Sequence, residues 1–311
     1  MKLSTQNGNL VFDFDREEAY RMIREAGFEA IDWNLDHQLN RKMLQSAEKL
    51  ENLCIFEKEL PEIHAFFAEE LSYIRENGLA FAQCHAPFPP YLPGRPDILE
   101  YSIRIYRRLI EFCQEIGCPK VVIHGVAFER ANQVDTEEDI LRMNRHLYES
   151  LIETLKKTDV IVCLENLFTS YQDVRYTDVC SDPHEAAAEI DRLNALAGKT
   201  CFGLCLDTGH LQLAHIRFYR YIPILGKRIV ALHIHDNDAI HDRHMAPYTG
   251  TILWEEFCEE LRKIGYEGDL NFETFHQLDR TVIDPELAPT FLKFIADVGS
   301  FFRSKIQEDA K

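Results

Sequence analysis

One short segment of the sequence is rich in residues that bind metals or carry protons. Residues 232–244, LHIHDNDAIHDRH, contain four of the thirteen histidines together with three aspartates. Imidazole and carboxylate side chains are the usual groups for both kinds of chemistry. A polar loop in solvent can have the same composition, so the meaning of the segment depends on its place in the fold.

Groups of the same two types recur at the ends of short apolar segments, as in VVIHG, CLEN and LNFET. The residues at or just beyond these ends are His85, His124, Glu165, Asp207, His210, His233, His235 and Glu273. A buried charge at the end of a strand needs a partner or a metal. Six successive segments that finish in this way therefore indicate one shared site.

Four of these residues form a ligand set for one divalent metal. They offer oxygen and nitrogen but no thiolate, which suits Mn²⁺, Mg²⁺, Co²⁺ or Zn²⁺, and they are Glu165, Asp207, His233 and Glu273. Such an ion can bind adjacent carbonyl and hydroxyl oxygens and stabilise an enediolate. Glu165 and Glu273 are then the catalytic pair, because one can abstract a proton and the other can return it.

Three other histidines are expected to bind substrate in the same pocket. His85 and His124 end the third and fourth apolar segments, and His210 follows Asp207 by three residues. An imidazole can donate or accept a hydrogen bond, so each of them could hold a substrate oxygen.

The histidine-rich segment itself leaves two questions open. His235 lies two residues after His233, so both face the same side if the segment is a strand. We expect His233 to be the ligand and His235 either to support a ligand or to line the pocket and bind substrate. Asp242 and His244 alternate in the loop that follows. That loop could fold back over the metal, or it could be a solvated acidic loop.

Eight apolar segments predict the strands that position these groups. They lie at about residues 2–6, 28–34, 79–84, 120–124, 160–165, 202–207, 228–235 and 269–273. Amphipathic stretches with helical spacing lie between them, among them 15–27, 96–117, 136–157, 182–196 and 253–265. This alternation predicts an α/β fold, a single (β/α)8 TIM barrel over residues 1–311 with its active site at the carboxyl ends of the strands. A doubly wound open sheet is the alternative, but neither GxGxxG nor GxxxxGK[ST] is present.

Composition limits the partners. The chain has 34 basic and 52 acidic residues, and its net charge of −18 repels phosphate backbones, so nucleic acid is disfavoured. No apolar run reaches membrane-spanning length and no basic leader opens the chain, so we expect a cytoplasmic protein with no membrane contact. The nine cysteines are scattered and never form CxxC, which predicts reduced thiols in the core. The oligomeric state stays open, a homo-oligomer included.

The motifs, taken in order, resemble the xylose isomerase-like TIM-barrel superfamily. That superfamily includes sugar isomerases, ketose 3-epimerases, inosose dehydratases and the AP endonucleases of family 2, such as endonuclease IV. The resemblance rests on GFEAIDWNLDH, CHAPF, VVIHG, CLENL, GLCLDTGH, LHIHDND, DRHMAPYTGTILWEEF and GYEGDLNFETF. It implies a metal held by Glu165, Asp207, His233 and Glu273, with the two glutamates as acid/base groups and His210 in contact with substrate.

A larger set also resembles the three-zinc, nine-ligand site of endonuclease IV. It adds His85, His124, His210, Asp242 and His244 as further metal ligands, with up to three Zn²⁺. The charge of −18, the opening segment and the lack of a Lys/Arg-rich loop with interleaved aromatic residues favour the carbohydrate branch. We therefore predict an isomerase or epimerase of a small sugar or sugar phosphate. A multi-zinc phosphodiesterase acting on abasic-site DNA and an inosose dehydratase-like lyase are the alternatives.

Overall fold

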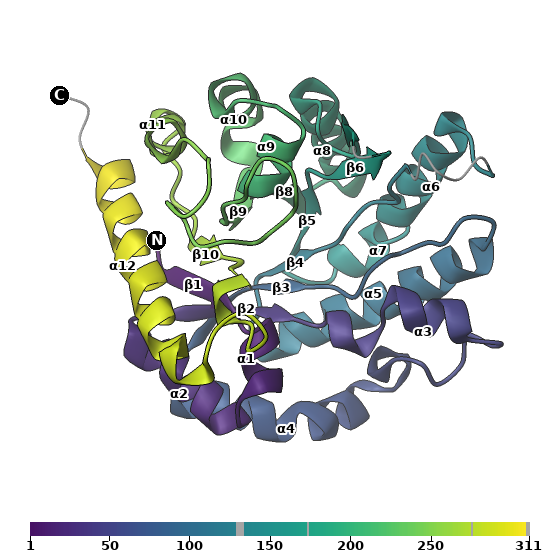
Figure 1. Ribbon diagram of the computed structural model, residues 1–311. Coiled ribbons are helices and arrows are strands. Elements are labelled where there is room, and N and C mark those ends of the chain that lie inside the picture. Colours follow the sequence, from purple (N-terminus) through teal and green to yellow (C-terminus); the bar gives the residue numbers. More distant parts are fainter. Residues whose placement is uncertain (129–133, 173, 275, 309–311) are drawn as a thin grey trace.

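Eight parallel strands form the centre of the molecule (Figure 1). The computed structural model describes residues 1–128, 134–172, 174–274 and 276–308. The strands, in sequence order, are β1 (Leu3–Gln6), β2 (Ala30–Asn34), β3 (Ala80–His85), β4 (Lys120–Val122), β5 (Ile161–Glu165), β8 (Phe202–Asp207), β9 (Ile229–His233) and β10 (Leu270–Phe272). Their order in the sheet is β10-β1-β2-β3-β4-β5-β8-β9.

The sheet closes into a barrel between β9 and β10. Ile234 and Phe272 form a parallel bridge just beyond the end of β9. The backbone N–H of Ile234 donates to the carbonyl of Asn271 (2.9 Å), and that of Glu273 donates to the carbonyl of Ile234 (3.0 Å). The predicted TIM barrel is therefore confirmed, and each of the eight predicted strands has its counterpart.

Helices surround the barrel (Figure 1). The longer ones are α2 (Arg16–Ala26), α4 (Leu60–Glu76), α5 (Pro96–Ile116), α6 (Glu137–Glu149), α8 (Pro183–Ala197), α10 (Phe218–Leu225), α11 (Trp254–Lys263) and α12 (Ala288–Gln307). The short ones are α1 (Gly8–Asp13), α3 (Arg41–Ser46), α7 (Ile152–Leu155), α9 (Thr208–Leu213), and the 3₁₀ turns η1 (Asp36–Gln38), η2 (Ile55–Glu57), η3 (Gly226–Arg228), η4 (His276–Leu278) and η5 (Pro285–Leu287). None in the described part of the chain is long and apolar enough to cross a membrane.

Local sequence signals explain several of these boundaries. Asp15 caps α2 by accepting the N–H of Glu17 (3.0 Å), and Gly27 ends that helix with φ 107°, a conformation that favours glycine. The stretch expected as one helix over 136–157 divides into α6 and α7. An antiparallel hairpin, β6 (Phe168–Tyr171) with β7 (Val174–Thr177), follows β5 and was not expected.

Two predicted strands are shorter than expected, which places two histidines beyond strand ends. β4 ends at Val122 rather than at residue 124, and β9 ends at His233 rather than at residue 235. The hydroxyl of Thr208 accepts the N–H of His235 (3.0 Å), in place of a neighbouring strand. His235 is therefore not part of the strand, yet the rings of His233 and His235 are both fully buried and both lie near the carboxylate of Asp207 (3.9 and 2.9 Å).

The apolar core lies mainly between the strands and the helices. Trp33, for example, points outward from β2 and packs against Phe67 (ring centroids 4.7 Å apart) and Phe112. A second, small cluster is formed by side chains of four strands, namely Val122, Cys163, Cys205 and Ala231. All nine cysteines are free thiols and eight of them are buried, as expected.

Candidate active site and metal centre

A cavity of about 310 Å³ lies where the strands end. Glu165 closes β5, and Glu273 directly follows β10, so the two carboxylates reach the cavity from different sides of the barrel. His85 closes β3 and also lines the cavity. Parallel strands bring these groups together because all of their carboxyl ends face the same way.

The centre of the site is the ring of His233. Its Nδ1 lies 3.3 Å from Oε1 of Glu165, 3.5 Å from Oε2 of Glu273 and 3.9 Å from Oδ2 of Asp207. These carboxylates come from three different elements of the barrel, and all four side chains are almost completely buried. The structure thus brings together the four residues that the sequence suggests as ligands.

This group suits a divalent cation. Neither nitrogen of His233 has an aligned hydrogen-bond partner among the described residues, and Oε2 of Glu165 is likewise without one. Buried polar atoms that lack a partner are costly, so their convergence points to a bound group. The oxygen and nitrogen donors fit the harder divalent ions, and Cys205 beside them adds a thiol that burial keeps protonated, because burial raises its pKa well above the usual value.

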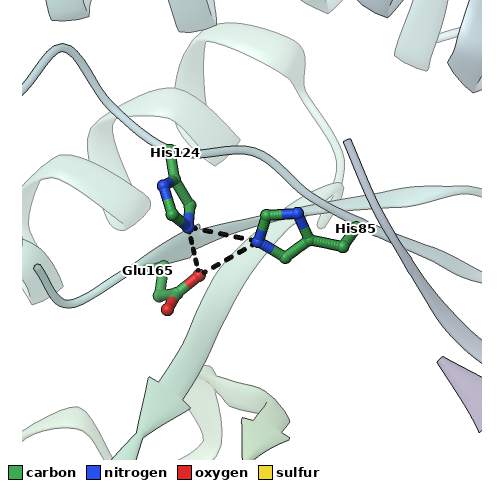
Figure 2. Close-up of side chains that lie close together, drawn as sticks. All are labelled: His85, His124 and Glu165. Atoms are coloured by element: carbon green, nitrogen blue, oxygen red, sulfur yellow. Dashed lines mark hydrogen bonds and ion pairs between the residues drawn. The ribbon is translucent and has the colours of Figure 1, made fainter. Parts of the chain in front are cut away.

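One flank of the centre consists of two histidines and the shared Glu165. Figure 2 shows the three side chains pointing toward one another. Nε2 of His85 lies 3.1 Å from Nε2 of His124, and the latter lies 3.0 Å from Oε2 of Glu165. The other nitrogen of His85 is 3.1 Å from Asp36, a residue of η1. These three converging groups could also hold a cation.

The opposite flank is formed by the loop after β9. Oδ2 of Asp242 lies 3.4 Å from Nε2 of His210 and 3.2 Å from Nε2 of His244. His244 also reaches the carbonyl of Glu273 through Nδ1 (3.1 Å). The loop therefore folds back over the barrel mouth, which is the first of the two possibilities that the sequence left open.

His235 contacts a candidate ligand. Its Nε2 lies 3.0 and 2.9 Å from the two oxygens of Asp207. The ring lies directly over Gly209, where a Cβ atom would be only 2.1 Å from Cε1 of His235. The position of His235 therefore supports the role of orienting Asp207 rather than that of holding substrate.

The charges in the site depend strongly on one another. Burial opposes the charge on His85, but the neighbouring Asp36 raises its pKa to about 9. Burial also opposes the charge on His244, and Asp242 together with Glu273 raises its pKa to about 9. The carboxylates of Asp36, Asp242 and Glu273 thus favour positive charge on the buried histidines beside them.

The pKa values of the carboxylates Glu165 and Asp207 also depend on their charged neighbours. Burial favours its neutral form, but His233 and His124 hold its pKa well below the usual range. For Asp207, burial likewise opposes the charge, whereas His210 and His235 lower the pKa. Both carboxylates are therefore held ionised, which is the form that a metal ligand needs.

An apolar wall faces the metal-binding groups. The ring of Phe88 lies 4.6 Å from that of His124, and the ring of Phe168 lies 5.2 Å from that of His210. Further apolar lining residues follow in the PFPPYLP segment and after β4, namely Pro89, Pro90, Tyr91, Pro93, Val126, Ala127 and Phe128. Such a wall suits the carbon face of a sugar ring.

Several residues of the site were not identified from the sequence. Asp36 and Arg41 line the cavity from the segment after β2. Gln6 donates through Nε2 to Oε1 of Glu273 (3.3 Å), and Asn166 bridges to β8 through both backbone groups of Asp207 (2.8 and 2.9 Å). The run of prolines in PFPPYLP and the asparagine after Glu165 were the available signals.

Comparisons with known proteins identify similar sequences and a family model. The family model described as xylose isomerase-like TIM barrel matches residues 20–296. Among curated proteins, the uncharacterized protein y4fM of Sinorhizobium fredii is 25% identical over 272 residues, which cover 84% of this chain and 81% of that protein.

Two solved structures illustrate the likeness in three dimensions. A D-tagatose 3-epimerase-like protein has a TM-score of 0.64 at 19% identity and covers 97% of this chain and 99% of its own. The 3-keto-D-glucoside 4-epimerase YcjR from E. coli has a TM-score of 0.65 at 18% identity and covers 98% of this chain and 99% of its own. At such identities the likeness establishes a shared fold.

Proposed function

The chain belongs to the xylose isomerase-like TIM-barrel family, and on that premise we propose that it is a divalent-metal-dependent isomerase or epimerase of a small carbohydrate. One observation carries the proposal. Glu165 and Glu273 approach Nδ1 of His233 within 3.3 and 3.5 Å from different sides of the barrel, and both line the cavity. Similarity of fold to sugar epimerases supports it.

Four residues would hold the metal, namely Glu165, Asp207, His233 and Glu273. When bound, a divalent ion supplies Lewis-acid stabilisation of the negative charge that develops on the sugar oxygens. Mn²⁺, Mg²⁺, Co²⁺ and Zn²⁺ all accept this donor set. His235 would orient Asp207, because its Nε2 contacts both carboxylate oxygens.

The two glutamates would move the proton. One carboxylate takes a proton from the carbon beside the sugar carbonyl, which leaves an enediolate of the sugar. The other glutamate, in its acid form, returns a proton to a carbon from the opposite side. Return to the same carbon gives an epimer. Return to the former carbonyl carbon gives the aldose–ketose isomer when the proton of the neighbouring hydroxyl also moves to the former carbonyl oxygen.

The remaining polar groups of the cavity would orient the sugar. His85, His124 and His210 present ring nitrogens near Glu165, at 3.9, 3.0 and 3.2 Å from its oxygens. These nitrogens can bond sugar hydroxyls, while Phe88 and Phe168, which contact the rings of His124 and His210, add apolar surface to the cavity. The cavity of about 310 Å³ lies at the lower end of the size range of ligand pockets.

Exchange of substrate protons with solvent tests this proposal. The protein is stripped with a chelator, reloaded with Mn²⁺ or Co²⁺, and incubated in D₂O with a panel of free and phosphorylated ketoses. Deuterium at the carbon beside the carbonyl, detected by NMR after the metal is removed, is the expected result. A metal-loaded protein that labels no ketose in the panel would contradict the proposal.

Variants of one catalytic residue and one matched residue sharpen the test. Glu273→Gln removes an acid/base group and should lower exchange by roughly 10²–10⁴-fold, with the barrel still folded. Glu70→Gln changes a carboxylate that is equally buried (4% exposed) but bonds to Tyr20 and Trp33 on the outer side of the barrel. It should leave exchange unchanged. Unaltered exchange in Glu273→Gln would refute the role of Glu273.

A second candidate function has its own observation. The two flanking groups, His85 with His124 and His210 with Asp242 and His244, lie on either side of the central ligands. This arrangement favours a multi-zinc phosphodiesterase. Three equivalents of zinc with cleavage of an abasic-site duplex would establish it in place of the sugar reaction, whereas loss of water from a cyclic polyol would indicate a lyase.

Asp242→Asn separates the one-metal and three-metal cases. If one metal suffices, the variant keeps its central ion and most of its proton exchange, because the ion-pair partners of Asp242 in the described structure are His210, His235 and His244, and none of these is a central ligand. If three zinc ions are needed, the variant loses bound zinc and its cleavage activity. Metal content by mass spectrometry, measured beside activity, distinguishes the outcomes.

A further inference from the structure

A buried aspartate lies beneath the candidate metal centre, and neither the candidate ligand sets nor the proposed catalysis includes it. Asp32, in the middle of β2, has no exposed surface and points into the barrel, whereas its neighbour Trp33 points outward. Burying an unpaired carboxylate costs free energy, so the groups that contact Asp32 indicate its role.

Two amides fix this carboxylate. Gln83, from β3, donates through Nε2 to Oδ2 of Asp32 (2.9 Å), and Asn271, from β10, donates through Nδ2 to the same oxygen (2.8 Å). Asn271 is itself held, because its Oδ1 accepts the hydroxyl of Ser4 (2.8 Å). Four strands thus hold one carboxylate oxygen in place inside the barrel.

The same oxygen faces the histidine of the metal centre. Nε2 of His233 lies 3.3 Å from Oδ2 of Asp32, while Nδ1 of that ring is the atom near Glu165 and Glu273. The ring therefore has a carboxylate below it and the candidate ligands above it. The contact is at ion-pair distance without full hydrogen-bond alignment, and contacts of this kind often tighten when a site is loaded.

A neutral imidazole carries one proton, and its place decides which nitrogen can bind a metal. We propose that Asp32 is a positioning residue that keeps the proton of His233 on Nε2, and so presents the lone pair of Nδ1 to the divalent ion. Its negative charge also makes the imidazole a stronger donor, as carboxylates behind metal-bound histidines do. The inference rests on the proposed metal site and adds the residue that orients its only nitrogen ligand.

A graded pair of substitutions tests it, with Co²⁺ as the probe. Asp32→Asn keeps an oxygen acceptor for Nε2 but removes the charge, and Asp32→Leu removes both. Affinity measured by chelator competition should fall in the order Asp, Asn, Leu, with a loss of roughly 10–100-fold for leucine. Glu70→Gln, a buried carboxylate outside the barrel, should bind Co²⁺ like the wild type.

The tautomer gives a readout that a merely structural residue would not move. In the Zn²⁺-loaded protein, ¹⁵N NMR should show His233 protonated at Nε2 in the wild type and in Asp32→Asn, with an altered spectrum in Asp32→Leu. If both variants lose stability toward urea but keep wild-type Co²⁺ affinity and the same tautomer, the inference is overturned and the proposed function stands. If the wild type itself binds no Co²⁺, the proposed metal site and this inference fail together.

Discussion

The rings of His235 and His244 lie face to face, with centroids 4.0 Å apart and planes inclined by only 15°. His235 follows β9 and His244 lies midway along the loop to α11, so this stack marks where the loop returns to the barrel. The return is what brings Asp242 within 3.4 Å of His210. The histidine-rich segment is therefore one closed loop over the site, and residues around it offer specific tests.

Gly209 controls the position of His235. A Cβ atom at residue 209 would lie 2.1 Å from Cε1 of His235, well inside van der Waals contact. We expect Gly209→Ala to push this ring away from Asp207 and to lower both Co²⁺ affinity and catalysis by roughly 10–100-fold. Chelator competition and the deuterium-exchange assay measure the two effects.

A crowded glycine elsewhere provides the control. In β8, a Cβ atom at residue 203 would lie 2.4 Å from Cγ2 of Val230, away from the ligands. Gly203→Ala should therefore lower the free energy of unfolding and leave Co²⁺ affinity unchanged. Equal metal affinity in the two alanine variants would show that His235 does not act through Asp207.

Asp236 organises the second half of the loop. Its fully buried carboxylate accepts bonds at 3.0–3.1 Å from the backbone N–H groups of Tyr248, Gly250 and Ile252 and from Nε1 of Trp254. We expect Asp236→Ala to lower the free energy of unfolding by about 3 kcal/mol, since it leaves several buried donors without an acceptor. Urea denaturation measures the change.

A nearby aspartate serves for comparison. Asp238 bonds the N–H groups of Ile240 and His241 on the exposed part of the loop. Asp238→Ala should change the free energy of unfolding by no more than about 1 kcal/mol, because water can replace an exposed acceptor. A similar loss of stability in both variants would argue against the special role of Asp236.

Glu57 gives a prediction for acid stability. Its carboxylate accepts the N–H groups of Asn52, Leu53 and Cys54 and the hydroxyl of Tyr101. Partial burial would raise its pKa, but the bond from Tyr101 and the backbone bonds lower it below the usual 4.5. A lowered pKa stabilises the fold fully above pH 4.5, and this contribution disappears as the pH falls through the lowered value.

Glu57→Gln should therefore destabilise the protein at pH 7 by roughly 1–2 kcal/mol and by clearly less at pH 3. Urea unfolding at the two pH values, compared with the exposed Glu51→Gln on the same segment, measures the difference. A deficit in Glu57→Gln that is as large at pH 3 as at pH 7 would contradict the prediction.

The local sequence pattern was sufficient to predict the architecture and many residues of the candidate site. Apolar runs of strand length alternated with amphipathic stretches, and a carboxylate or histidine ended one run after another. Because parallel strands in a barrel converge at their carboxyl ends, Glu165, Asp207 and Glu273 could be expected to meet before any coordinates were known. The family resemblance drawn from those motifs was confirmed by the match over residues 20–296.

The contacts of Asp32 and the closure of the loop after β9 depend on interactions between segments far apart in the sequence. In the sequence, Asp32 is only one acidic residue within an apolar strand. The folded structure shows that it contacts Gln83, His233 and Asn271. Likewise, the composition of the loop after β9 suited a solvated turn as well as a cover for the site. Its closure depends on the stack of His235 with His244 and on the bonds of Asp236, which form only in the folded barrel.

The sequence by itself thus determined the barrel, its family and the set of residues at its carboxyl end, because strand period, helix period and strand-end chemistry are local properties. Only the tertiary structure decided how these residues group around His233, and that Asp32 contacts His233 while His235 contacts Asp207. Hydrogen-bond partners and ring orientations are set by packing between residues far apart in the chain, so spacing alone does not contain them.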